Sequence, residues 1–505
     1  MMNLAVHREN WIQPTLWVLM LIFAWSLILS IAVVQSVTLL MTVLWLVHRA
    51  VTREWKFKRT DLDIAYACFV LARLISIPFS INLSASVEAL TKEVIYYGLF
   101  FVVTQEFPIR EKDAVKWIFW SFIGAGMIAS IYGSIVYFLG AQGRATSTVS
   151  GPVTLGMYLT AVTSMVLILG RNRSFFPRTW MWIITTAILV IGVVSTLNRI
   201  HWGLMLLMMG IIGILRERKL LFLLVIGSAI AVLSPPVASR LSSSLSSVSE
   251  FMNGRDVIWL DALEHAAERP LVGFGPRTFH DVFTGREAIR DKRVGSWHND
   301  YLQMYMESGL LGLGGFLWVM FVVFRKGWSA WKILKGDPFW RDVVLALLLA
   351  MIAFYVSGLV GGFVIDPLNS LFHRFLLGIL ALVILHAPTL SSDVAEAGGP
   401  NCHEFTPEGN TDLLTIADLI RSAKCVVTPD TSIIHIASAV QTPVLGFYTP
   451  LRVTNEWMPF GVKYDIVLAE NGRPVSSIPT DIVAVRTKAF LGGIRPRTLI
   501  KGPEH

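Results

Sequence analysis

The stretch that decides the fold is Trp297-His298-Asn299-Asp300-Tyr301-Leu302-Gln303, followed after three residues by Glu307-Ser308-Gly309-Leu310-Leu311-Gly312-Leu313. It closes a polar segment, 235–308, and leads directly into a long apolar run. A polar connection of roughly seventy residues is far longer than a link between two helices requires, and loops of that length usually carry function. We therefore expect function in this loop, with His298 near the start of the apolar run.

The composition is that of a membrane protein. Of the 505 residues, 54% are hydrophobic and only 15% are charged, and repeated long apolar runs predict transmembrane helices. The formal net charge of +8 could indicate nucleic-acid binding. In a membrane protein, however, basic residues gather in cytoplasmic loops, and we expect no nucleic-acid partner. The polar loop contains no cysteine, so no disulfide framework is expected there.

We expect an all-α polytopic membrane protein with about twelve transmembrane helices and a large helical outer loop. The run 14–48 is too long for one helix, and Ser30 to Ser36 offers a turn that divides it. Further spans follow the first one, which predicts a retained anchor rather than a cleaved signal peptide. The predicted spans are 14–29, 32–48, 62–80, 87–105, 114–139, 153–170, 179–197, 201–215, 219–234, 309–325, 341–362 and 369–387.

Lysine and arginine predict the orientation of these helices. The short loops on one side carry roughly nineteen basic residues, whereas those on the other side offer little beyond Arg144 and Arg199. Because positive charge marks cytoplasmic loops, we expect both termini in the cytoplasm. The loop 235–308 would then face outward, which is the periplasm if the protein lies in a Gram-negative inner membrane.

The composition changes after Pro388, where the predicted transmembrane domain, residues 1–388, ends. Residues 389–409 are polar and contain glycine, as is typical of a linker. Residues 410–490 predict a cytoplasmic half-Rossmann segment of α/β type, and 491–505 are a tail. The expected elements, which include one βαβ unit, are a helix at 416–422, a strand at 425–428, a helix at 433–440 and a strand at 444–448.

Two arginines on the outward side are candidate anion-binding residues. Arg199 lies in a turn of a few residues between two predicted spans, where a charge is costly and indicates a site; snorkelling to lipid head groups is the alternative. Arg255 follows Asn253 and Gly254 and opens a helical pattern. An arginine at a helix N-terminus is unfavourable with the helix dipole unless an anion is bound there. The alternative is a solvated loop arginine.

His298 and Arg144 are further candidates. His298 could act as a base, although a lone histidine is often only a hydrogen-bonded structural residue. We expect no metal, because His265, His280 and His298 are widely spaced and neither a cysteine nor a His-x-x-x-His pair supports them. Arg144, on the predicted outer loop 141–152, could bind a phosphate or be solvated.

The segment Pro270 to Pro276 contains a glycine-rich turn, Gly273-Phe274-Gly275. A Gly-x-Gly pattern that no strand precedes does not predict a nucleotide-binding loop. We expect these glycines to let two backbone segments pack closely near the bilayer.

The order and spacing of these motifs resemble the O-antigen ligase family over roughly residues 14–388. The resemblance implies a multi-helix inner-membrane glycosyltransferase that needs neither metal nor other cofactor. Such an enzyme moves a glycan from undecaprenyl diphosphate to the lipid A core oligosaccharide. The family's essential histidine matches His298, and its two arginines match Arg199 and Arg255. The motifs are Arg199 after an apolar span, Gly254-Arg255, Trp259, Pro270 to Gly275, Phe279, His298 to Gln303, and Glu307 to Gly312.

These residue types suit that reaction. The leaving lipid diphosphate carries at least two negative charges, which two arginines can bind and neutralise without a metal. A neutral imidazole can take the proton of an acceptor hydroxyl, an effect worth roughly 10²–10⁴-fold in rate. Direct displacement by the acceptor would invert the anomeric carbon. Asn299 or Asp300 could orient the imidazole, and Arg144 could bind the diphosphate or a core phosphate.

The C-terminal segment carries a second resemblance, over about residues 410–475, to the C-terminal lobe of heptosyltransferase-type glycosyltransferases. It rests on Thr428 to Ser438 and Pro443 to Pro450. The acceptor lobe of those enzymes is missing, and Ser432 stands where glycine is common. Because half a cleft cannot easily exclude water or position two substrates, we expect a non-catalytic remnant or docking module.

Other functions stay open. An O-antigen polymerase of the same superfamily would use a second lipid-linked glycan as acceptor, and a protein O-oligosaccharyltransferase would use pilin. A polytopic transporter belongs to a different class. Twelve spans would suit a transporter, but the sequence shows neither halves related by repetition nor a pair of broken helices.

Overall fold

The chain forms two compact units, Met1–Ala387 and Pro388–His505. Most of the predicted span 219–234, most of 235–251, and the predicted linker beyond Ser391 lie outside the described residues. In this computed structural model the described residues are 12–53, 55, 57–215, 218, 221, 238–239, 242, 252–285, 294–391, 413–429, 432–448, 458–469, 478 and 480–492.

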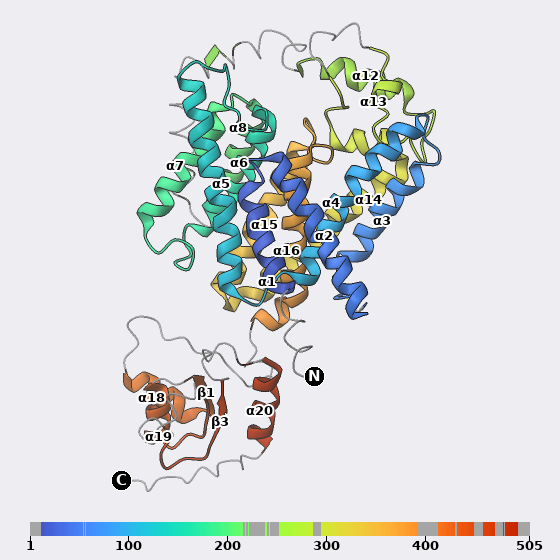
Figure 1. The fold of residues 1–505 in the computed structure, drawn as a ribbon. Coiled ribbons are helices and arrows are strands. Elements are labelled where there is room, and N and C mark those ends of the chain that lie inside the picture. The colour runs from blue at the N-terminus through green and yellow to red at the C-terminus, as the bar shows by residue number, and fades with distance from the viewer. Residues whose placement is uncertain are drawn as a thin grey trace. The chain divides into compact units, whose positions relative to one another are not determined.

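In the first unit, the regular secondary structure of the described residues is helical (Figure 1). Each predicted span other than 219–234 falls on a helix, although α3 ends at Ser76, earlier than predicted. The helices are α1 (Ile12–Ser26), α2 (Ile31–Thr52), α3 (Asp63–Ser76), α4 (Leu83–Glu106), α5 (Lys112–Phe138), α6 (Pro152–Leu169), α7 (Thr179–Ser195), α8 (Arg199–Leu215), α12 (Arg255–His265), α13 (Phe279–Val282), α14 (Asp300–Ile333), the short 3-10 helix η2 (Leu334–Gly336), α15 (Pro338–Ser357) and α16 (Pro367–Ser391).

Six helices in the described part of the chain are long and apolar enough to cross a membrane: α2, α5, α6, α14 together with η2, α15 and α16. The helices α1, α7 and α8 are apolar but shorter. These helices support a multi-pass membrane protein, because a span needs about twenty apolar residues. The number twelve and the outward position of the loop 235–308 stay predictions.

The centre of the first unit consists of α16, α15 and α6. The most apolar window of α16 is 94% buried, and those of α15 and α6 are 83% buried, against 28% for α2. A helix that is apolar on all sides belongs in an interior, which explains the central three. On α2 the apolar side chains of Leu39, Val43 and Val47 are exposed instead, as expected of a surface that faces lipid.

The long helix α14 is broken at Gly309, where φ is 61° and ψ is −158°. The glycine-rich turn packs against this break: Phe274 N donates to Met306 O at 2.8 Å, and Leu310 N donates to Pro270 O at 2.7 Å. A Cβ atom at Gly309 would lie 2.2 Å from the carbonyl carbon of Leu271. The predicted close packing of this turn is therefore confirmed.

The second unit contains a three-stranded parallel sheet with strand order β1-β2-β3. Val426 pairs with Val444, and Val444 pairs with Tyr464. The predicted βαβ unit is confirmed, but the sequence analysis did not predict β3 and α20. The elements are α18 (Leu413–Ser422), β1 (Val426–Pro429), α19 (Ser432–Ala439), β2 (Val444–Tyr448), β3 (Tyr464–Leu468) and α20 (Thr480–Gly492).

Candidate functional site

Arg199 is the first residue of α8. The chain turns from α7 to α8 within three residues, with Leu197 in the left-handed region at φ 48°. Asn198 Oδ1 accepts a hydrogen bond from Ile200 N at 3.2 Å and so caps the helix. This turn fixes Arg199 at the N-terminal end of α8, as the sequence predicts.

Arg144 lies at the same turn. Its Nε atom donates to the carbonyl oxygen of Thr196 at 2.8 Å, and Ala145 N donates to Ser195 O at 2.9 Å. These bonds dock the loop between α5 and α6 onto the turn that carries Arg199. Arg144 also lines an open cavity with Gln142, Gly143, Thr146 and Leu197.

Arg255 is the first residue of α12, which follows Gly254 at φ 83°. No side chain caps this helix, so the backbone N–H groups of its first turn receive no side-chain acceptor from the N-cap residue. The guanidinium donates through Nη1 to Met252 O at 3.4 Å. Its buried Nε atom has no hydrogen-bond partner among the described residues, which leaves a donor for an anion.

The charge of Arg199 acts on Arg255. Burial lowers the pKa of Arg255, and the positive charge of Arg199 lowers that pKa further. Two guanidinium groups that repel one another within a partly desolvated region raise the local positive potential. A bound polyanion would remove this repulsion.

His298 lies two residues before α14, in the left-handed region at φ 49°. The preceding Trp297 is 1% exposed, and its carbonyl oxygen accepts a hydrogen bond from Trp259 Nε1 at 3.0 Å. Trp297 also belongs to an apolar cluster with Ile258, Ala262, Phe274, Phe279, Val282, Phe283 and Met306. This cluster joins α12 to the start of α14 and therefore holds Arg255 and His298 in one local body.

Burial lowers the pKa of His298 to about 4, and the charge of Arg255 contributes to the shift. At neutral pH the imidazole is therefore uncharged and can accept a proton. Among the residues that the structure describes, none makes a hydrogen bond with this ring. A substrate hydroxyl could thus reach it without displacing a protein partner.

The three predicted residues share one feature: each begins a helix or directly precedes one. Arg199 starts α8, Arg255 starts α12, and His298 precedes α14. Helix N-termini carry partial positive charge and bind anions. Asn198 and Asn299 cap two of these helices, whereas α12 has no side-chain cap. The start of α12 is therefore the best place for an anionic oxygen.

Asn299 and Asp300 have other partners than the imidazole. Asn299 Oδ1 accepts from Tyr301 N and Leu302 N, at 2.9 and 3.0 Å, as the cap of α14. The carboxylate of Asp300 accepts from Phe363 N at 2.9 Å and from Val364 N at 3.3 Å. Both side chains fix the start of α14, and their effect on His298 acts through the backbone.

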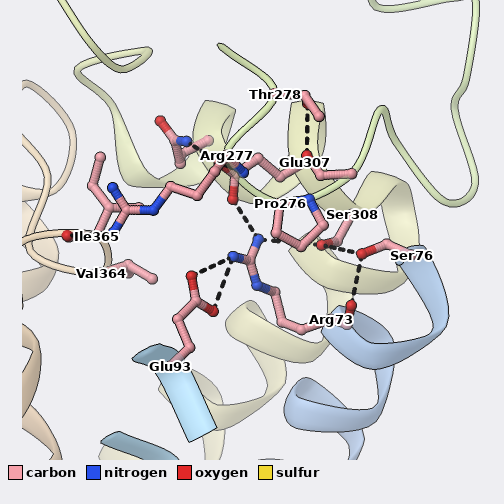
Figure 2. Close-up of polar contacts among 12 residues, drawn as sticks. Arg73, Ser76, Glu93, Pro276, Arg277, Thr278, Glu307, Ser308, Val364 and Ile365 are labelled. Atoms are coloured by element: carbon pink, nitrogen blue, oxygen red, sulfur yellow. Dashed lines mark hydrogen bonds and ion pairs between the residues drawn. The ribbon is translucent and has the colours of Figure 1, made fainter. Parts of the chain in front are cut away.

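Sequence reasoning missed a buried ionic network that joins α3, α4 and α14 (Figure 2). Arg73 of α3 pairs with Glu93 of α4 at 2.9 Å and with Glu307 of α14 at 2.6 Å. The exposed fractions of the three side chains are 2%, 5% and 0%. The sequence did contain an indication of this network, because Arg73 and Glu93 lie within predicted spans, where a charge indicates a buried partner or a site.

The described residues include no group of three or more histidine, cysteine, aspartate or glutamate side chains that could hold a metal ion. The expectation of metal-independent chemistry stays a prediction.

Comparison with known proteins identifies two segments. Residues 184–317 match the family model described as O-antigen ligase, and this segment contains Arg199, Arg255 and His298. Residues 387–478 match the family described as glycosyltransferase family 9 (heptosyltransferase). None of the curated proteins matches the chain. The two resemblances predicted from the sequence are thus confirmed: residues 184–317 are similar to the O-antigen ligase family and residues 387–478 to the heptosyltransferase family.

Proposed function

We propose that this protein is an O-antigen ligase, which transfers a glycan from undecaprenyl diphosphate to a sugar hydroxyl of the lipid A core. The family matches support glycosyl transfer in O-antigen processing. The observation that carries the proposal is the grouping of Arg199, Arg255 and an uncharged His298 at the starts of three helices within the matched segment.

The reaction uses each of these groups. The acceptor oxygen forms a bond to the anomeric carbon of the glycan as the bond to the diphosphate oxygen breaks, which inverts that carbon. The hydroxyl proton goes to His298, whose ring is uncharged at neutral pH and therefore has a lone pair that can accept it. The undecaprenyl diphosphate leaves as the anion, and the guanidinium groups of Arg199 and Arg255 stabilise the charge that it gains.

Arg255 and the start of α12 act together on the leaving group. The unpartnered Nε atom of Arg255 and the first N–H groups of α12 supply donors to phosphate oxygens. A guanidinium can engage two oxygens of one phosphate at once, which an ammonium cannot do. Arg144, fixed at the turn before Arg199, would bind the second phosphate or a phosphate of the core.

The proposed setting is a bacterial inner membrane, with both termini in the cytoplasm and the site facing the periplasm. The basic residues of the short loops support this orientation. It places the site where a lipid-linked glycan and the lipid A core are both available in the outer leaflet. The heptosyltransferase-type segment would then be cytoplasmic, and we assign it a docking role rather than catalysis.

The test is transfer by the purified protein, supplied with undecaprenyl-diphosphate-linked glycan and with core lipid A, a second lipid-linked glycan, or pilin. Product on core lipid A supports the ligase. Product on the second glycan or on pilin identifies a polymerase or a protein oligosaccharyltransferase instead. His298→Ala should abolish transfer, whereas His280→Ala, at an exposed histidine of the same loop, should leave it unchanged. No product with any acceptor, together with movement of the glycan lipid across vesicles, would identify a transporter.

A further inference from the structure

A continuous set of hydrogen bonds connects the His298 segment to the interior of the helical unit. Trp297 N, one residue before His298, donates to Gln303 Oε1 at 3.0 Å. Gln303 Nε2 donates in turn to Glu307 Oε1 at 2.5 Å. Gln303 and Glu307 are four residues apart on one face of α14, and both are almost fully buried. The backbone at the histidine is therefore tied to a buried carboxylate through one amide.

Glu307 is held on both of its oxygens. Besides Gln303, its Oε1 atom accepts from Arg277 N at 2.8 Å, and its Oε2 atom pairs with Arg73 Nη1 at 2.6 Å. Arg73 is anchored on its other side by two bonds to Glu93, at 2.9 and 3.1 Å. Figure 2 shows Glu307 between Arg73 and the backbone of Arg277. In a desolvated interior a carboxylate that is bound on both oxygens has little freedom to move, so Glu307 offers Gln303 a fixed acceptor.

The His298 backbone needs such support. A histidine with φ near +49° occupies the left-handed region, which residues other than glycine adopt infrequently. It stays there only when its surroundings hold it. Two bonds fix the preceding peptide groups: Trp297 N to Gln303, and Trp259 Nε1 to Trp297 O. The cap made by Asn299 fixes the next residue. Of these, only the Gln303 bond leads to the ionic network.

We propose that Gln303, oriented by the Arg73–Glu307 ion pair, is a positioning residue that holds the His298 imidazole in its reactive direction. Gln303 must accept from Trp297 N and donate to Glu307 at the same time. A glutamine amide does both, a methionine side chain does neither, and an ionised glutamate accepts but cannot donate. This inference rests on the proposed role of His298 as a base.

The test compares Gln303→Met and Gln303→Glu with Gln35→Met as the matched control. Gln35 is a helical glutamine of α2 whose amide donates to the hydroxyl of Tyr96 at 3.4 Å rather than to a residue of this network. We expect kcat of Gln303→Met to fall about 10²-fold while KM for the lipid-linked donor changes little, because the arginines that bind the donor are untouched. Gln35→Met should keep the wild-type kcat.

The Gln303→Glu variant supplies a pH signature that loss of packing alone would not give. When protonated, the introduced carboxyl can both accept from Trp297 N and donate to Glu307, as the amide does. When ionised, it repels the carboxylate of Glu307. The next charged groups in the network are Arg73 and Glu93. Its kcat should therefore fall as the pH rises from about 6 to about 8, because two adjacent carboxylates share a proton until the pH is high. The wild type should stay flat, since His298 is uncharged throughout this range.

A second measurement does not depend on the reaction. The NMR signal of isotope-labelled His298, assigned by its loss in His298→Ala, should shift and broaden in Gln303→Met and stay in place in Gln35→Met. If the wild type transfers glycan to no acceptor, the proposed function fails, and this signal still tests the positioning. If Gln303→Met does not fold, the pH dependence of kcat in Gln303→Glu tests the positioning role instead. A wild-type kcat with an unmoved His298 signal in Gln303→Met, or a flat profile in Gln303→Glu, would overturn the inference.

Discussion

Replacing Arg73 with methionine tests whether the ionic network supports the fold beneath the site. Arg73 is 2% exposed and pairs with Glu93 and Glu307, whose side chains are 5% and 0% exposed. Methionine roughly preserves the apolar volume but removes the charge and every hydrogen bond of the guanidinium. Two buried carboxylates would then lose the cation that offsets the cost of burying them.

Removing one partner of a buried ion pair costs about 3–5 kcal/mol. Because about 1.4 kcal/mol corresponds to tenfold in an equilibrium constant, the ratio of folded to unfolded protein should fall by about 10²–10⁴. Arg73→Lys should lose less, since a lysine keeps the charge but cannot engage both carboxylates with a planar fork. The free energy of unfolding should therefore decrease in the order wild type, Arg73→Lys, Arg73→Met.

The assay is equilibrium unfolding in mixed micelles, followed by far-ultraviolet circular dichroism as the denaturing detergent is increased. The control is Lys92→Met, which breaks the exposed Lys92–Glu88 pair on α4; solvent screens such a pair, so its loss should change stability little. If Arg73→Met unfolded within about 1 kcal/mol of the wild type, the pair would contribute no more than an exposed one. The reasoning from burial would then be refuted.

Four further predictions concern the site and the C-terminal segment. Arg199→Lys and Arg255→Lys should each lower kcat/KM for the lipid-linked donor, because a point charge does not replace a bidentate fork; steady-state transfer measures this, and wild-type rates in both variants would count against the two-arginine site. Transfer should be constant from about pH 8 to 6 and decline as the pH falls towards 4, because His298 has a pKa of about 4 and its protonated ring cannot act as a base. Folding stability should weaken below about pH 6.5, since the unfolded chain then takes up a proton at this histidine that the folded chain resists. A rate that instead rose as the pH fell through this window would exclude His298 as the base. Ending the chain after Ala387, at the boundary between the two compact units, should preserve transfer by the first unit. Loss of activity in a truncated protein that still folds would show that the C-terminal segment takes part in the reaction.

Periodicity and composition predicted the helices well, because long apolar runs have few alternatives in a membrane protein. Arg255 was expected to open a helix, and α12 begins there. The turn before Arg199 was expected to be short, and α7 ends at Ser195. The break of α14 at Gly309 was not predicted, because a single glycine within an apolar run does not reveal that another segment will fill the break.

The contacts that orient the site were less accessible from sequence. Arg73 and Glu307 are 234 residues apart in the chain, and nothing local in either segment identifies the other as its partner. Asn299 or Asp300 was a candidate to orient the imidazole, although adjacency in sequence is no evidence for it, and their hydrogen bonds go to the start of α14 and to the loop before α16. Neighbours in sequence often face apart at a helix N-terminus, because successive side chains point in different directions.

The central claim is that Arg199 and Arg255 bind the donor diphosphate beside His298, and protection of His298 from chemical modification tests it most directly. Diethyl pyrocarbonate reacts with uncharged imidazoles, and the modified peptides can be quantified by mass spectrometry, with His280 as internal reference. The account predicts that saturating undecaprenyl diphosphate slows modification of His298 but not of His280, and that Arg255→Met removes the protection. Equal rates at His298 with and without the lipid would contradict it.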